Sequence, residues 1–165
     1  MAALYTNQIN FLGSQLLHDT KVRWLTNYAQ HLIPSLKNEK RAFALVVNTD
    51  VAAEPGEQWL ALYAPRDSLK IEMVDSFGLP PNIFSIDPSL IHFFSRSIQS
   101  FGSKVCGHYA LLFIYFRSRN YSFDNTINNL DKNFTDAFAA CKIYDLSRFK
   151  LSHLHCTGQC CKNIS

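Results

Sequence analysis

The sequence predicts a single α+β domain in which a small, mostly antiparallel sheet is flanked by helices. Three observations support this fold class. Short apolar segments follow one another closely between residues 43 and 74, a long apolar segment begins at Cys106, and apolar residues recur at helical spacing near the N-terminus and after residue 124. With 47% hydrophobic and 18% charged residues, the composition is typical of a folded globular protein.

The domain is expected to span residues 1–150, since a chain of 165 residues is long enough to bury one core. Residues 151–165 form a Cys/His-rich tail without a recognisable pattern, and we expect this tail to be disordered. Its segment HLHCTGQCC contains residue types found in zinc sites, but the spacings are tight and no earlier loop offers a matching pair. The sequence therefore predicts no metal site and no cofactor.

The first forty residues are expected to form short amphipathic helices outside the sheet. Apolar residues recur there at spacings of three and four, and Pro34 ends the region. The residues that form this pattern are Phe11, Leu16, Leu17, Trp24, Leu25, Tyr28 and Leu32.

Three strands are expected next. Residues 43–47 (FALVV) are apolar and rich in β-branched side chains, residues 58–63 (QWLALY) are a second apolar run, and residues 69–74 (LKIEMV) alternate. Their short links predict an antiparallel meander. The chain then leaves the sheet from Asp75 to Gly78, and Pro80 and Pro81 indicate a loop.

The second half of the chain is expected to be mainly helical. Pro88 is placed to open a helix that continues to Ile98, and a polar loop follows over residues 99–105. The apolar run from Cys106 to Phe116 favours a buried helix, with a strand as the alternative, and residues 124–140 predict one more helix.

Charge and composition limit the classes of partner. The net charge of +3 and short basic clusters such as Lys37, Lys40 and Arg41 are typical of a solvated surface, so the sequence does not support a nucleic-acid partner. No apolar run reaches the ~18–20 residues that span a bilayer, and residues 1–10 lack the features of a secretory signal. The five cysteines show no regular spacing, so we expect no disulfide framework. We therefore expect an intracellular monomer, with nucleus or cytoplasm undecided.

Cys106 lies where the polar loop meets the apolar helix. A thiol at a helix N-terminus faces the positive end of the helix dipole and backbone N–H groups without helical partners, so we expect the pKa of Cys106 to be lowered. The same N–H groups can stabilise an oxyanion. A small buried hydrophobic residue remains the alternative interpretation of Cys106.

Four blocks of sequence extend this observation. In chain order they are FALVVNTD (residues 43–50), PGEQWLALY (55–63), MVDSFGLPP (73–81) and IQSFGSKVCGHYALLF (98–113). Together they resemble the adenovirus endopeptidase (adenain) family and its relatives encoded by Maverick/Polinton-type transposons. That family is related in fold to the cysteine proteases that remove ubiquitin-like proteins.

The resemblance implies a papain-like cysteine protease fold and a polypeptide substrate, either a viral or transposon structural protein or a ubiquitin-like protein. It implies that Cys106 is the nucleophile, that Asp75 is the acid that orients a histidine, and that Gln99 is a side chain of the oxyanion hole. Trp59 matches the aromatic residue beside the histidine and is assigned to substrate binding. Without the resemblance, Asp75 would be a turn former, Gln99 a loop residue and Trp59 a large core or rim aromatic residue.

The sequence departs from the family at Gln58, which occupies the position of the catalytic histidine. A glutamine amide can donate and accept hydrogen bonds, but it has no usable pKa and cannot take the thiol proton. We therefore expect little or no proteolysis, or a protein that only binds peptides or proteins. A decayed protease, a binding module and a single-residue variant all remain open.

No other histidine has a spacing that supports it as a substitute. On a helix, His108 points ~200° away from Cys106. His92 is expected on a helix face, and His18 and His31 lie in the N-terminal region that we expect to be helical.

Overall fold

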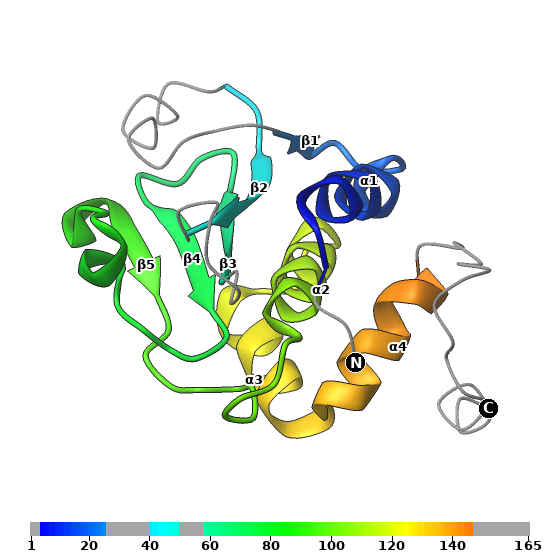
Figure 1. The fold of residues 1–165 in the computed structure, drawn as a ribbon. Coiled ribbons are helices and arrows are strands. Elements are labelled where there is room, and N and C mark those ends of the chain that lie inside the picture. The colour runs from blue at the N-terminus through cyan, green and yellow to red at the C-terminus, as the bar shows by residue number, and fades with distance from the viewer. Residues whose placement is uncertain (1–3, 26–39, 50–57, 147–165) are drawn as a thin grey trace.

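The computed structural model describes residues 4–25, 40–49 and 58–146 of the chain. Within these ranges it contains four α-helices, five strands and two 3-10 turns, arranged around one sheet (Figure 1). In chain order the elements are α1 (Thr6–Leu17), β1 (Arg23–Trp24), β2 (Phe43–Asn48), β3 (Trp59–Ala64), β4 (Ile71–Asp75), η2 (Pro81–Phe84), η3 (Pro88–Leu90), β5 (Ile91–Phe93), α2 (Cys106–Ser118), α3 (Phe123–Asn133) and α4 (Asp136–Leu146).

The five strands lie in the order β1-β2-β3-β4-β5, which confirms the predicted α+β class. The three central strands form the expected antiparallel meander, with Val46 opposite Ala61 and Ala61 opposite Val74. The two edge strands pair in parallel, β1 with β2 and β4 with β5. The sheet is therefore antiparallel at its centre and parallel at both edges.

Both faces of the sheet are buried, and β3 shows how. Trp59, Ala61 and Tyr63 belong to one core, which they share with the helices, whereas Leu60 and Leu62 belong to a second core on the opposite face. This division follows from the alternation of side chains along a strand. It explains why residues 59–63 are apolar throughout, since neither face of this strand meets water.

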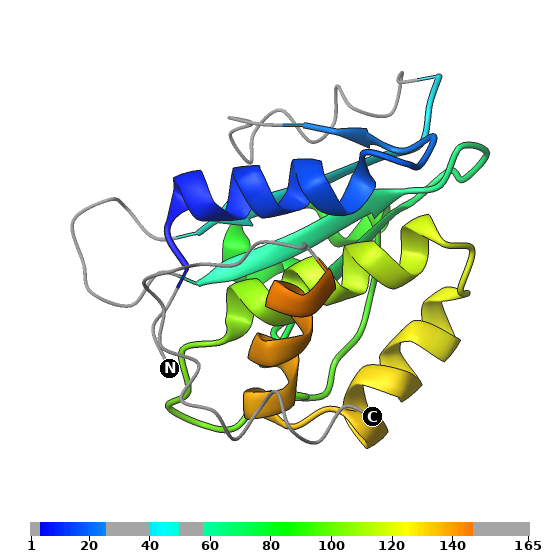
Figure 2. The ribbon, with the colours of Figure 1, turned by 90° about the vertical axis from the view of Figure 1, so that its right-hand side faces the viewer.

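Helix α2 is the central helix of the first core. Its residues from Cys106 to Ile114 are all buried, and α1, α3 and α4 pack around it. Figure 2 views the molecule from the side of these helices, with the sheet behind α1 and α2. The expected helix is thus confirmed and the strand alternative is wrong.

Close packing at the start of α2 depends on Gly107. A Cβ atom at this position would lie 2.9 Å from Ile9 Cδ1 and 3.2 Å from Trp59 Cδ1. The absence of a side chain therefore lets the end of α2 that carries Cys106 approach β3 and α1 closely.

Two predictions about secondary structure are wrong because strand pairing overrides local spacing. Trp24, expected in a helix, lies in β1 and pairs with β2. The helix expected from Pro88 to Ile98 is only one 3-10 turn, η3, after which Ile91 pairs with Ile71 of β4. Backbone groups at a free sheet edge offer these short segments hydrogen bonds that a single helical turn does not.

The last predicted helix is divided in two. Residues 124–140 were expected to be continuous, but α3 ends at Asn133 and α4 begins at Asp136. Phe134 has an extended backbone (φ −115°, ψ 127°), so the chain turns between the two helices. Both then pack on α2.

Some expectations concern residues outside the described ranges. These include Tyr28, His31, Leu32, Pro34 and the Cys/His-rich tail. Among the helices that the structure describes, none is long and apolar enough to cross a membrane. In the same residues, no group of three or more His, Cys, Asp or Glu side chains is placed to hold a metal ion.

Candidate active site

The Cys106 thiol lies at the first residue of α2, beside the start of β3. Only 5% of the residue is exposed. Burial raises the pKa of the Cys106 thiol above its ordinary value of 9.0, and the negative charge of Asp75 raises it further. Backbone N–H groups of Trp59, Gly107 and Cys106 itself oppose this rise without cancelling it. The expectation that the helix terminus lowers this pKa is therefore wrong, because removal from water outweighs the favourable dipole.

Gln58 immediately precedes β3, where Thr49 anchors its backbone. The Thr49 N–H donates to the Gln58 carbonyl oxygen over 3.0 Å. The Gln58 side chain then reaches the neighbouring strand, and its Nε2 donates to Asp75 Oδ1 over 2.6 Å. An amide thus makes the contact with the acid that an imidazole N–H makes in a Cys–His–acid triad.

Asp75 is the last residue of β4 and is fully buried. Its second carboxylate oxygen, Oδ2, accepts the backbone N–H of Leu79 over 2.8 Å. Burial raises the pKa of the Asp75 carboxyl, and the hydrogen bonds from Leu79, Gln58 and the Phe77 N–H oppose this rise. The carboxylate is therefore held by donors on both oxygens.

The turn after Asp75 requires Gly78. This residue has φ +75°, and a Cβ atom there would lie only 2.4 Å from the backbone carbonyl carbon of Arg96. Its N–H donates to the Asp75 carbonyl oxygen over 2.9 Å. The glycine of the DSFG segment thus closes the turn that brings Leu79 back to the Asp75 carboxylate.

Gln99 is also buried, with 5% exposure, and its side-chain amide is hydrogen-bonded to two serines. Its Oε1 accepts the Ser76 hydroxyl over 2.5 Å. Its Nε2 donates to the carbonyl oxygen of Ser103 over 2.8 Å and to Ser103 Oγ over 2.7 Å. The carbonyl can only accept, so it fixes the orientation of the amide.

These bonds determine what Gln99 can do. Both hydrogen bonds that the Gln99 Nε2 donates go to Ser103, so its amide is held by the loop between Gln99 and Cys106. The sequence did not single out Ser76 and Ser103. Both are small polar residues beside stronger motifs, and no spacing rule identifies them as partners of Gln99.

Trp59 supports the site from inside the core. It is 2% exposed, and its Nε1 donates to the carbonyl oxygen of Leu4 over 3.2 Å. The indole therefore fixes the N-terminal segment against β3. The contact with a substrate assigned to Trp59 remains a prediction.

The described histidines have other partners. His108 is buried on α2, and its Nε2 lies 3.4 Å from the hydroxyl oxygen of Tyr144 on α4. His92 lies on β5 rather than on a helix, with its ring centroid 4.1 Å from that of Phe123. His18 Nδ1 is 2.8 Å from the carbonyl oxygen of Gln15 at the end of α1. The side chain bonded to Asp75 where a triad places its imidazole is Gln58.

Comparisons with known proteins gave one kind of match. No protein-family model matches the sequence, and no curated protein matches it significantly. Among solved structures, the chain is similar to the crystal structure of the selenomethionine form of the ASFV pS273R protease. The TM-score is 0.53 and the sequence identity 18%, and the match covers 88% of this chain and 66% of that chain.

This similarity shows the fold. At this identity the likeness concerns the path of the chain and not the chemistry of the site. The predicted α+β class is therefore confirmed, and the fold of this chain is similar to that of the solved protease. It spans about two thirds of the length of the solved protease that it matches.

Proposed function

We propose that this chain is a cysteine-endopeptidase-like domain that binds polypeptide beside Cys106 and hydrolyses it slowly or not at all. The observation that carries the proposal is the 2.6 Å hydrogen bond from Gln58 Nε2 to Asp75 Oδ1. In the geometry of a Cys–His–acid triad, this bond belongs to the imidazole that serves as the general base.

The chemistry of peptide hydrolysis explains why this exchange matters. A base must take the Cys106 proton so that Sγ can attack the carbonyl carbon, and an acid must protonate the departing amine. A glutamine amide does neither at neutral pH. The buried thiol, with its raised pKa, is mostly protonated and supplies little thiolate by itself.

The adenain family is the lineage that we propose for this domain. The proposal rests on the four sequence blocks, which follow one another in the order typical of the family, and on the similarity to a solved viral protease. In this proposal Cys106, Asp75 and Gln99 keep their family positions. Polypeptides, such as structural proteins of a virus or transposon or ubiquitin-like proteins, are the ligands.

A binding module without catalysis is the second candidate, and the hydrogen bonding at the site favours it. Gln58 and Asp75 satisfy one another, while Gln99 is engaged by Ser76 and Ser103. The loop that joins Gln99 to Cys106 also carries Phe101, a fully exposed aromatic side chain. An exposed aromatic ring near a site that lacks a general base is suited to binding a peptide without cleaving it.

Peptide cleavage by a set of variants tests the proposal. We expect Gln58→His to cleave a peptide library ~10²–10⁴-fold faster than the unaltered protein, since this is the usual contribution of a general acid–base group. Gln58→His combined with Cys106→Ala should have no activity, and Gln58→Asn, which retains an amide, should resemble the unaltered protein. Turnover by the unaltered protein that Cys106→Ala abolishes would show that another group is the base.

Peptide binding distinguishes the second candidate. If Gln58→His does not cleave, peptide binding to Cys106→Ala can be followed by fluorescence anisotropy. We expect Phe101→Ser to weaken that binding by several-fold without lowering the melting temperature, because the ring is exposed. Unchanged binding in Phe101→Ser would exclude this ring from the peptide site.

A further inference from the structure

A large hollow lies at the end of the molecule away from Cys106. It measures about 1410 Å³ and is bordered by the chain after α1, β1, the chain leading into β2, the link from β3 to β4, and the C-terminal end of α2. Phe43 at the start of β2 pairs with Ala64 at the end of β3. This pairing brings residues 40–42, before β2, close to residues 65 and 66, after β3, and both segments line the hollow. The proposed peptide site does not use this hollow.

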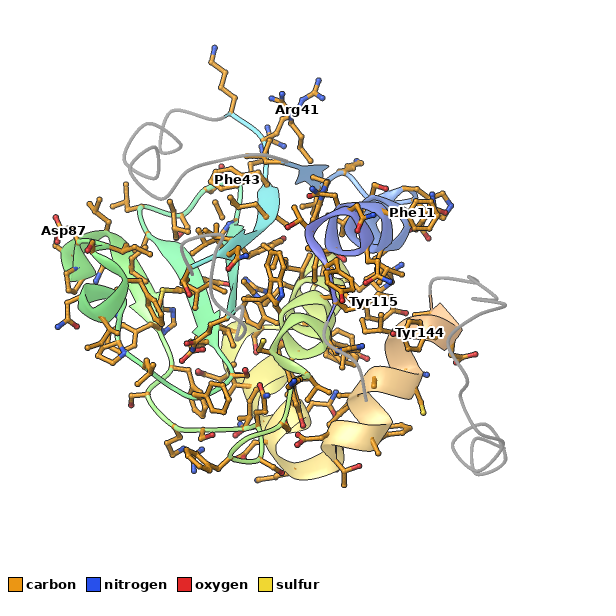
Figure 3. The ribbon with its side chains drawn as sticks, in the orientation of Figure 1. Phe11, Arg41, Phe43, Asp87, Tyr115 and Tyr144 are labelled. Carbon is orange, nitrogen blue, oxygen red and sulfur yellow. The ribbon has the colours of Figure 1, made fainter. Side chains whose placement is uncertain are left out.

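Cationic side chains surround the hollow. Five of them are exposed and come from three separate stretches of the chain; they are Lys21, Arg23, Lys40, Arg41 and Arg66. Arg117 of α2 and Arg119, the residue that follows α2, complete the lining, in which Asp19 is the one carboxylate among the described residues. Figure 3 shows the Arg41 side chain projecting outward from the chain that leads into β2. A concave surface lined by one sign of charge concentrates counterions of the other sign.

Arg117 and Arg119, at the C-terminal end of α2, form one wall of the hollow. Arg117 donates from Nε and Nη2 to the two carboxylate oxygens of Glu72 over 2.6 and 2.7 Å. Its guanidinium carbon also lies 4.9 Å from the centre of the Tyr63 ring. Arg119 Nη2 is bonded to Asp19 Oδ1 over 3.2 Å. These contacts fix the position of both guanidinium groups. We expect the exposed cations Lys21, Lys40, Arg41 and Arg66 to attract the ligand.

We infer that this hollow is a binding site for a compact anion that carries several phosphate groups. Arg side chains match phosphate oxygens with paired N–H donors, and Lys side chains add mobile point charges. One phosphate would leave most of this space and most of these cations unused. The cations converge on one concavity instead of forming a stripe along one face, which favours a compact ligand over a nucleic-acid strand.

The site is separate from the peptide site. Cys106 is the first residue of α2, whereas Arg117 and Arg119 lie at its end. A helix of this length spans ~20 Å at 1.5 Å per residue. Binding of the anion can therefore be tested whatever the outcome for proteolysis.

Calorimetry with inorganic tripolyphosphate at physiological salt is the direct test. We expect one equivalent to bind and to raise the melting temperature, since a ligand that binds only the folded state stabilises it. The double variant Arg41→Gln, Arg66→Gln should lose at least ~10-fold in affinity, because two charge-assisted contacts disappear. Lys132→Gln, an exposed lysine on α3 outside the hollow, is the matched control and should bind as the unaltered protein does.

The other outcomes are equally informative. Absence of binding at that salt, or an equal loss in Lys132→Gln, overturns the proposal, since net charge alone would then account for the data. Displacement of tripolyphosphate by oligonucleotides with an affinity that grows with length also overturns it, in favour of a nucleic-acid surface. Tighter binding to phosphoinositide-containing vesicles than to phosphatidylcholine vesicles supports the phosphate site and identifies a lipid headgroup as its source.

Discussion

At the scale of single residues, the environment of Cys106 makes its reactivity depend on position 58. Burial and the charge of Asp75 raise the pKa of the thiol, and the side chain next to Asp75 is an uncharged amide. An imidazole at position 58 would take the thiol proton and form an ion pair with the thiolate. The difference in the pKa of Cys106 between the unaltered protein and Gln58→His therefore measures how strongly an imidazole at position 58 would stabilise the thiolate.

Alkylation of Cys106 by iodoacetamide tests this conclusion. In the unaltered protein we expect a rate that rises with pH through a midpoint above 9.0, because the thiolate is disfavoured by burial. In Gln58→His the midpoint should fall below 9.0, since an imidazolium stabilises the thiolate. Mass spectrometry of the peptide that contains Cys106 separates this thiol from the other cysteines, with Cys106→Ser as the blank. The same midpoint in both proteins would contradict the geometry proposed for position 58.

His108 predicts how stability depends on pH. Burial lowers the pKa of His108 from 6.5 to about 4. The unfolded chain therefore binds this proton at a higher pH than the folded protein does. The stability associated with neutral His108 is present above pH 6.5 and is lost as the pH falls toward 4.

Urea unfolding at several pH values measures this loss. We expect the free energy of unfolding to fall by up to ~3 kcal/mol across that interval, at 1.36 kcal/mol per pH unit. His108→Gln should flatten this part of the profile. His92→Gln, which changes an exposed histidine, should leave the slope as it is. A steep slope that persists in His108→Gln would assign the effect to other groups.

At the scale of elements, two glycines with the same backbone angle play different parts. Gly78 and Gly102 have φ +75° and +76°, but a Cβ at Gly78 would meet the Arg96 backbone at 2.4 Å, whereas one at Gly102 would meet nothing within 4 Å. A side chain at either glycine would strain the backbone. A side chain at Gly78 would also push the turn away from the Arg96 segment. The pair therefore separates backbone strain from steric conflict.

Alanine substitution measures the difference in denaturant unfolding. Gly102→Ala should lower the free energy of unfolding by ~1 kcal/mol through left-handed strain alone. Gly78→Ala should lower it by about 3 kcal/mol or more, because the turn that carries Leu79 to the Asp75 carboxylate must also move. Equal losses in the two variants would mean that the Arg96 segment yields easily and does not brace this turn.

Some helices and strands could be predicted from the sequence alone, and others could not. The helix at Cys106 and the strands of the meander could be predicted, since buried apolar runs of these lengths strongly limit the choice of element. The edge strand β5 could not, because its conformation depends on the free edge of β4. At the site, Gln58, Asp75 and Cys106 came from one linear pattern. The serines that engage Gln99 and the direction of the Cys106 pKa depend on three-dimensional packing, for which local sequence offers no rule.

At the scale of the whole molecule, the fold brings together charges that are far apart in the sequence. Lys40 and Arg41 resemble an ordinary solvated cluster by themselves. The parallel pairing of β1 with β2 and the return of α2 place Arg23 and Arg117 around the same hollow. Such a cluster cannot be recognised from the order of charges along the sequence. The net charge of +3 therefore gave no indication of the cationic hollow.

The two ends of α2 are expected to act independently. Substitutions more than ~10 Å apart without shared partners usually combine additively, within ~0.5 kcal/mol, and the buried length of α2 separates Cys106 from the hollow. In a Gln58→His background, adding Arg41→Gln and Arg66→Gln should therefore change kcat/KM for peptide cleavage by no more than ~2-fold. Saturating tripolyphosphate should have an equally small effect in that background. A change of ~10-fold or more on adding tripolyphosphate, absent from the Arg41→Gln, Arg66→Gln protein, would instead establish a coupling free energy between the sites, with α2 as the rigid element that both contact.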